Sequence, residues 1–113
     1  MILVGMNNNP VTIQMTKIII NPGICGFTTT VEVTKEAKRR VSISINSDCE
    51  QIAGLGKSLK ELDMWDVLKP GANCEVHRQA LRHQLHSVCP VPIGILKAIE
   101  VEAGMALPRD VII

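Results

Sequence analysis

The chain has 113 residues, the length of a single domain, and 46% of them are hydrophobic. Twelve basic residues balance eleven acidic ones, and a net charge of +1 disfavours nucleic acid or an anionic membrane as the main partner. One Trp, one Phe and no Tyr leave few side chains for stacking on bases. The opening residues contain no basic leader and no long apolar run. We therefore expect a cytoplasmic protein with no nucleic-acid partner and no membrane partner.

The first half of the chain has the pattern of a small antiparallel sheet. Residues 1–14 include the polar run Asn7-Asn8-Asn9-Pro10 and are predicted to be an N-terminal tail, which leaves residues 15–113 as one domain. Strands are predicted at about 16–20, 26–34 and 39–46, because apolar and polar residues alternate in the second and third of these segments. The expected fold is therefore α+β, with a three-stranded antiparallel sheet covered on one face by three to four helices.

The second half of the chain has helical patterns. The capping-box sequence Ser47-x-x-Glu50 predicts a short helix ending near Gly56. Further helices are expected over about 58–68 and 73–88, where apolar residues recur at helical spacing. A fourth helix should begin after Pro90 and Pro92 and end at Gly104, and residues 111–113 could add an edge strand.

Three of the four cysteines lie where one element is expected to give way to the next. Cys25 follows a Pro-Gly turn, and Cys49 and Cys89 each precede a predicted helix. Free N–H groups at a helix start stabilise a thiolate, and thiolates bind metals. The pattern predicts a three-thiol site, with burial of the thiols as the alternative. Cys74 precedes an apolar helix face and is expected to be a small buried side chain.

The histidines offer further ligands or bases. His83, His86 and Cys89 are spaced three residues apart and could share a helix face, a set that zinc can use. A fourth metal ligand could be His86 or Cys74, or could come from a partner. In an alternative interpretation, Cys89 or Cys49 is a nucleophile and His83 or His86 is its base. A small interaction domain with buried cysteines is a third interpretation.

The order of these elements resembles the U-type (NifU-like) iron–sulfur cluster assembly scaffolds. The resemblance rests on Cys25-Gly26 before a strand, Cys49 at a helix start, Gly56-Lys57-Ser58-Leu59 and a third cysteine opening a helix. It covers residues 25–100 and implies that Cys25, Cys49 and Cys89 bind a cluster or zinc. The chain differs from those scaffolds at the positions beside each cysteine, where Phe27, Asp48, Glu50 and Val88 stand.

The chain is also similar to a small uncharacterised family with the patterns Asn-Pro-Gly-Ile-Cys-Gly-Phe and Cys-Pro-Val-Pro. Together these features predict a protein that binds a metal ion or iron–sulfur cluster through Cys25, Cys49 and Cys89. It would act as a scaffold, carrier or electron-transfer partner, rather than as an enzyme, with a protein partner for transfer of the cluster or metal. The sequence leaves its oligomeric state open.

Overall fold

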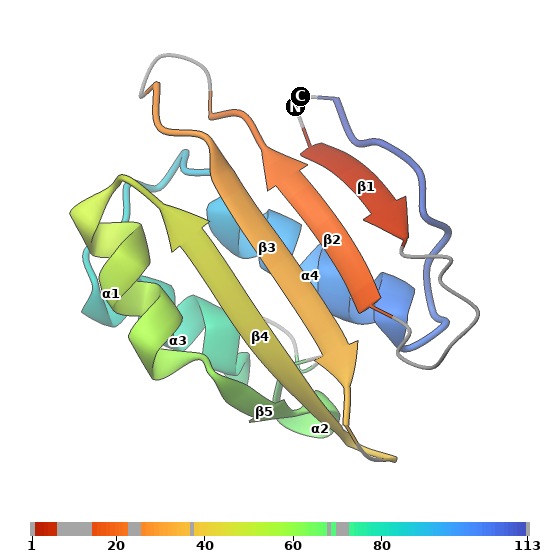
Figure 1. Cartoon of the computed structure of the whole chain (residues 1–113). Helices are drawn as coiled ribbons and strands as arrows, with labels where there is room; N and C mark the ends of the chain where they lie inside the picture. The colour runs from red at the N-terminus through yellow and green to blue at the C-terminus, as the bar shows by residue number, and fades with distance from the viewer. Residues whose placement is uncertain are drawn as a thin grey trace.

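A computed structural model describes residues 2–6, 15–22, 26–36, 38–67, 69 and 73–112 of the protein. For residues 2–6 it describes the backbone alone. Its sheet consists of β1 (Ile2–Met6), β2 (Met15–Ile20), β3 (Thr29–Lys35), β4 (Arg40–Ser47) and β5 (Glu61–Asp63). These five strands lie side by side in chain order, and each is antiparallel to the next. β1 to β4 follow one another directly, whereas β5 joins after a helix, and Figure 1 shows the helices packed against the sheet.

The sheet has one buried face, as the alternating pattern predicts. Side chains at every second position of β2 and β3, and in the first half of β4, are buried, and they include Ile18, Val31 and Val33. The predicted antiparallel pair of β3 and β4 is confirmed, with Val31 opposite Ile45 and Val33 opposite Ile43. The α+β class and the helical cover on one face are confirmed as well.

Two helices provide most of that cover. α1 (Glu50–Ser58) packs on β4, and α4 (Val91–Glu102) packs on β2 and β3. α1 runs through Gly56, where a Cβ atom would lie 3.2 Å from Ile45 Cβ, so this glycine permits close packing of the helix on the sheet. α2 (Met64–Val67) and α3 (Glu75–Arg82) complete the layer, and α3 contacts α4.

A carboxylate ties the end of α4 to the sheet. Glu102 accepts hydrogen bonds from Thr16 Oγ1 (2.9 Å) and from the backbone N–H of Lys35 (3.1 Å). The Thr16 side chain is fully buried, so this bond satisfies a polar group on the core face of β2. After Glu102 the helix closes with Met105 N–H donating to the Glu100 carbonyl and Gly104 in the left-handed region (φ 77°), a Schellman motif.

The sheet is wider than the three strands predicted. Where a tail was expected over residues 1–14, residues Ile2–Met6 form β1, which pairs with β2 along its length; residues 7–14 lie outside the described part. Where a helix was expected over 58–68, Glu61–Asp63 form β5. Residues 61–63 form a strand because they pair with the edge of β4: Ile43 N–H donates to the Lys60 carbonyl, and Leu62 lies opposite Val41. Pairing with β4 thus overrides the helical spacing.

Two helix boundaries also differ from the predictions. Ser47 is still part of β4, so the N-cap of α1 is Cys49 instead of Ser47. The helix expected over 73–88 ends at Arg82, because Gln84 adopts a left-handed conformation with φ 57°. In place of the edge strand expected over 111–113, Val111 makes a single β-bridge, and Ile113 lies outside the described part. Figure 1 shows the segment after α4 returning along the side of the molecule that carries β1.

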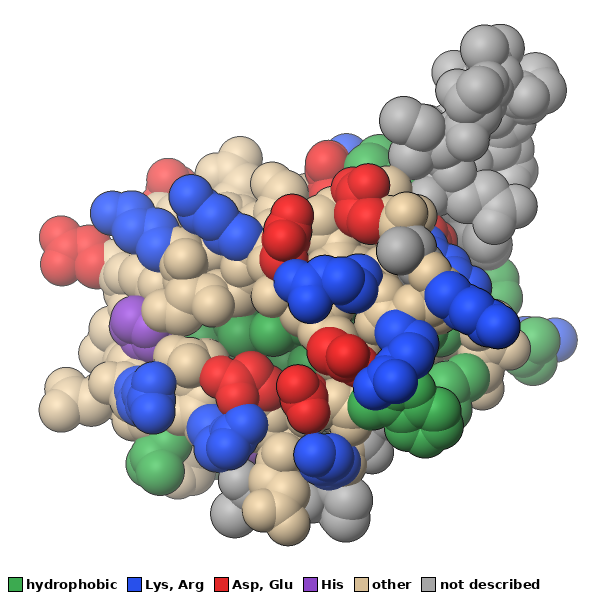
Figure 2. All heavy atoms as spheres, turned by 90° about the horizontal axis from the view of Figure 1, so that it is seen from below, with side chains coloured by type: hydrophobic (Ala, Val, Ile, Leu, Met, Phe, Trp, Pro, Cys, Tyr) green, Lys and Arg blue, Asp and Glu red, His purple; other side chains and the backbone are tan. Residues whose placement is uncertain are grey.

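The end of the molecule that carries the β3–β4 turn is charged with both signs. Figure 2 shows Lys and Arg interleaved with Asp and Glu on this face. Arg39 pairs with Asp63 at 3.3 Å and lies 5.5 Å from the ring centroid of Trp65, and Arg40 pairs with Glu61 at 3.4 Å. Among the described residues, no helix is long and apolar enough to cross a membrane.

Candidate functional site

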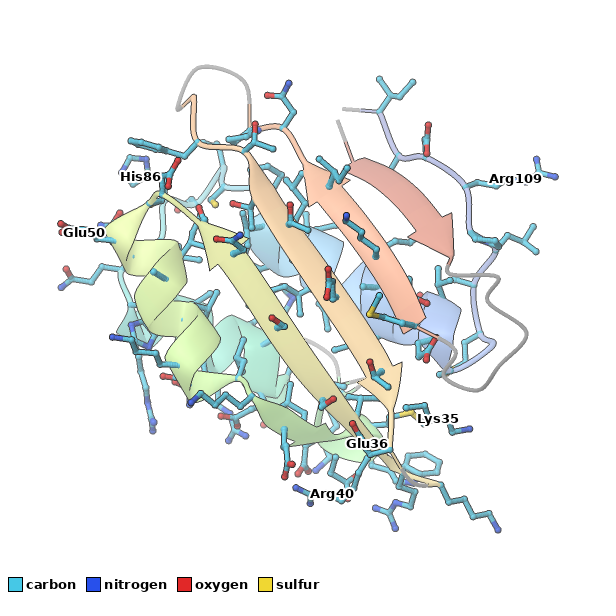
Figure 3. The ribbon with its side chains drawn as sticks, viewed as in Figure 1. Lys35, Glu36, Arg40, Glu50, His86 and Arg109 are labelled. Atoms are coloured by element: carbon cyan, nitrogen blue, oxygen red, sulfur yellow. The ribbon has the colours of Figure 1, made fainter. Side chains whose placement is uncertain are left out.

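A cleft of about 240 Å³ lies at the opposite end of the sheet, where β4 gives way to α1. Two of the predicted site cysteines, Cys49 and Cys89, line it together with His86. Figure 3 labels His86 and Glu50 at this end of the molecule, far from Lys35 and Arg40. The remaining lining residues are Pro22, Phe27, Gln51, Ile52 and Leu85.

Cys49 is placed in the cleft by the start of α1. It is the N-cap residue, with extended backbone angles (φ −76°, ψ 122°), and its carbonyl accepts the first helical hydrogen bond from Ala53 N–H at 2.9 Å. Its thiol donates a long hydrogen bond to Gln51 Oε1 at 3.8 Å. A nine-residue helix directs its positive dipole end toward this position, which favours negative charge on a thiolate or ligand.

A hydroxyl pair behind Cys49 holds the turn from β4 into α1. Ser47 Oγ accepts a hydrogen bond from the backbone N–H of Cys49 (3.2 Å) and another from Thr29 Oγ1 (3.0 Å). Thr29 is fully buried on β3, directly opposite Ser47 in the sheet register. The position of Cys49 is thus connected to the core of the sheet through two side chains.

The sequence predictions did not include Thr29 or Ser47 in the site. A signal was present, because Thr29 shares the alternation of Val31 and Val33 and is therefore a polar residue on the core face of β3. A buried hydroxyl needs a hydrogen-bond partner, and in the β3–β4 hairpin the residue opposite Thr29 is Ser47.

Cys89 and His86 reach the cleft from the turn between α3 and α4. The backbone N–H of Cys89 donates to the His86 carbonyl at 3.0 Å, which closes a tight turn and brings the two residues near each other. α4 begins two residues after Cys89, with Val91 and Pro92 both buried against the core. The half-buried Cys89 is therefore attached to a firmly packed helix start.

His83 has a different role from His86. It caps the end of α3, its Nε2 lies 2.8 Å from Ser58 Oγ, and a Cβ atom at Gly54 would lie 3.1 Å from its Nδ1. These contacts join α3 to α1 and lie outside the cleft lining. The helix face that His83, His86 and Cys89 were expected to share does not form, since α3 ends at Arg82.

Cys74 also lies apart from the cleft. It is 1% exposed at the N-cap of α3, and its thiol donates a hydrogen bond to the Val67 carbonyl at 3.0 Å. The Cys74 side chain therefore packs in the core as a small apolar group, and its S–H donor has a hydrogen-bond acceptor.

Cys25, the third expected thiol, lies outside the described residues. Pro22 and Phe27, which precede and follow it in the sequence, both line the cleft. Within the described ranges, no three His, Cys, Asp or Glu side chains are grouped closely enough to hold a metal ion. Cys49, Cys89 and His86 therefore line one cleft without lying close enough to one another to form a metal site by themselves.

These donors define a small α+β protein with a thiol-lined cleft at one end of an antiparallel sheet. Thiol and imidazole groups are ligands of zinc and of iron–sulfur clusters, and a thiol at a helix start is also a nucleophile. The chain belongs to a family of unknown function, DUF6951, whose match covers residues 16–113. The same comparisons match no curated protein and no solved structure.

Proposed function

We propose that the protein binds a soft metal ion or an iron–sulfur cluster at the cleft and acts as a scaffold, carrier or electron-transfer partner. The observation that carries this proposal is that Cys49 and Cys89, which are far apart in the sequence, line one cleft with His86. Thiol and imidazole groups are the donors that such ligands use; the three described groups share the cleft without being grouped closely enough to hold a metal, so binding would have to draw them together.

Cys25 would provide the third thiol. Its neighbours Pro22 and Phe27 line the same cleft, so the chain passes the cavity shortly before and shortly after it. The resemblance to the U-type scaffolds implies the same three cysteines as ligands. His86 lines the same cleft and is a candidate for a fourth ligand, whereas the Cys74 thiol donates a hydrogen bond in the core.

The surroundings of the donors fit such a ligand. Phe27, Ile52 and Leu85 give the cleft apolar walls, and walls of this kind limit solvent access and tune the redox potential of a bound centre. A bound zinc ion would be held by sulfur atoms at about 2.3 Å, and a bound cluster would supply one-electron chemistry.

Metal content of anaerobically purified protein tests the proposal. We expect iron with sulfide, or zinc, in the wild-type protein by elemental analysis, with sulfur-to-metal bands in the absorption spectrum if iron is bound. Cys25→Ala, Cys49→Ala and Cys89→Ala should each abolish binding. Cys74→Ala is the control, because it removes a thiol outside the cleft and should retain the metal. Circular dichroism establishes that each variant is folded.

The metal proposal fails if the wild-type protein holds no stoichiometric metal after anaerobic purification and after reconstitution with iron and sulfide or with zinc. It fails as well if Cys49→Ala and Cys89→Ala bind as tightly as Cys74→Ala.

A second candidate function is thiol chemistry, and the position of Cys49 favours it. Cys49 stands at the N-terminus of α1 and lines a cleft that His86 also lines, so a thiol and an imidazole that could serve as its base share one cavity. In metal-free protein this function predicts that substoichiometric iodoacetamide labels Cys49 much faster than Cys89, and that His86→Ala slows the labelling. Equal labelling of both cysteines would contradict it.

A further inference from the structure

The outer edge of β4 is covered by a strand over only part of its length. β5 pairs with Arg40–Ser42, and the adjoining Ile43 N–H donates to the Lys60 carbonyl. From there to Ser47, β4 has no strand beside it on this edge within the described ranges. Figure 1 shows β5 beside one end of β4 and α1 beside the other. An open edge of this kind can pair with a further strand.

The backbone groups of two residues point to this open edge. Successive residues of a strand direct their N–H and C=O groups to alternate sides. Because Ile43 directs its N–H toward the β5 side, Ile45 and Ser47 direct theirs to the same side, whereas Ser44 and Asn46 direct theirs toward β3. In the described part of the chain, no backbone group of another element bonds to Ile45 or Ser47 there. These two residues therefore offer donors and acceptors to an extended chain.

A groove of about 530 Å³ lies at the same edge, between β4 and α1. The second half of β4 lines one side of it, and α1 contributes the small residues Ala53 and Gly56. Small residues at such a position allow another backbone to approach closely. The groove thus has room beside the backbone groups that lack a strand partner.

The groove also carries positive charge that no described carboxylate offsets. Lys57 and Lys60 both line it and are exposed, and neither belongs to an ion pair within the described ranges. Glu61 lines the groove as well, but Arg40 pairs with it at 3.4 Å. The charge therefore favours an anionic occupant.

We propose that this groove binds an extended acidic segment of a partner protein, which adds to the sheet as a strand beside the second half of β4. Hydrogen bonds to the backbone of Ile45 and Ser47 hold the segment extended, and its carboxylates meet Lys57 and Lys60. A second copy of this chain, pairing through the same edge, would bring a second pair of lysines to the seam, and like charges disfavour that arrangement. The groove shares no lining residue with the thiol-lined cleft, so strand addition does not rest on metal binding.

An acidic peptide titrated into the full chain tests the proposal. The probe is an acetylated and amidated hexapeptide that alternates Glu and Val, and we expect saturable chemical-shift changes with a dissociation constant of about 1 mM or tighter. The same peptide with Lys in place of Glu is the control and should not bind. At saturation, amide hydrogen exchange should slow several-fold at Ile45 and Ser47 and much less at Ser44 and Asn46, whose N–H groups already face β3.

Charge reversal in the groove tests the role of the lysines. Lys57→Glu combined with Lys60→Glu should weaken binding at least roughly tenfold, because each change replaces an attraction by a repulsion. Lys38→Glu is the matched control, since Lys38 is an exposed lysine between β3 and β4, outside the groove, and binding should be unchanged. Circular dichroism establishes that each variant is folded.

Three results overturn the proposal. The first is the absence of saturable binding by the acidic peptide, and the second is binding that the double lysine variant leaves intact. The third is binding without selective slowing of exchange at Ile45 and Ser47, which would show attraction between charges with no added strand. Binding of the peptide by metal-free protein keeps this test separate from the metal proposal.

Discussion

Substituting Thr29 by Val should disturb Cys49 more than it disturbs the fold. The change removes the donor of the 3.0 Å hydrogen bond to Ser47, whose oxygen also receives the Cys49 N–H. A neutral hydrogen bond contributes about 0.5–1.5 kcal/mol net, and the added buried methyl offsets about 0.8 kcal/mol of that. We expect unfolding to become easier by about 1 kcal/mol or less, which lowers the melting temperature by at most roughly 4 °C.

Thr16 offers a matched control at the other end of the same buried face. It is also fully buried, and its hydroxyl donates to the Glu102 carboxylate at 2.9 Å. A hydrogen bond to a charged group contributes about 1.5–3 kcal/mol. Thr16→Val should therefore lower the melting temperature by roughly 8 °C, about twice the effect of Thr29→Val.

The assay is the rate of iodoacetamide labelling of Cys49 relative to Cys89 in the same metal-free molecules, measured by peptide mass spectrometry. Loss of an ordering bond of about 0.7 kcal/mol should raise the Cys49 to Cys89 ratio roughly threefold in Thr29→Val. Thr16→Val should leave the ratio at the wild-type value despite its greater loss of stability. Thr29→Ser keeps the hydroxyl and should keep the ratio. Equal ratios in Thr29→Val and Thr16→Val would refute the positioning role of Thr29.

Two further predictions concern the fold. Deleting residues 1–14 removes β1 and should lower the melting temperature by roughly 5 °C or more in a thermal scan, because β2 loses its pairing with β1. An unchanged melting temperature would show that β1 contributes nothing to stability. Gly56→Ala should cost about 1–3 kcal/mol in denaturant unfolding, since its Cβ would press on Ile45 Cβ at 3.2 Å. Gly54→Ala should cost less, because its Cβ would lie 3.1 Å from the half-buried His83 ring, a side chain that can shift, whereas the Gly56 Cβ would meet the packed Cβ of Ile45. Both changes gain about 1 kcal/mol of helix propensity, so equal losses at the two glycines would contradict this account.

Much of the sheet could be predicted from local pattern. The alternation in β3 and β4 predicts both the antiparallel hairpin and its buried face, because side chains of a strand point alternately to the two sides. The end of α4 was also predictable, since Gly104 takes a left-handed conformation that few other residues adopt. The placement of Cys49 and Cys89 at helix starts follows from the same local signals.

β1 and β5 could not be predicted in this way. Residues 61–63 have apolar neighbours at helical spacing, and only the free backbone groups along the edge of β4 draw them into a strand. Residues 2–6 join the sheet because β2 offers its other edge. Such pairings are decided by backbone hydrogen bonds between distant segments, and neither segment carries a sequence signal for the other.

The sequence by itself determined which residues could act in a site: three cysteines at element boundaries, with histidines nearby. Tertiary structure decided which of them meet. Cys49 reaches the cleft because Ser47 and Thr29 anchor the start of α1, and His86 reaches it because the chain reverses at Gln84. The same reversal leaves His83 against Ser58, outside the cleft. The physical reason is that local pattern controls the direction of a side chain within its own element, whereas the distance between two elements depends on how their buried faces pack.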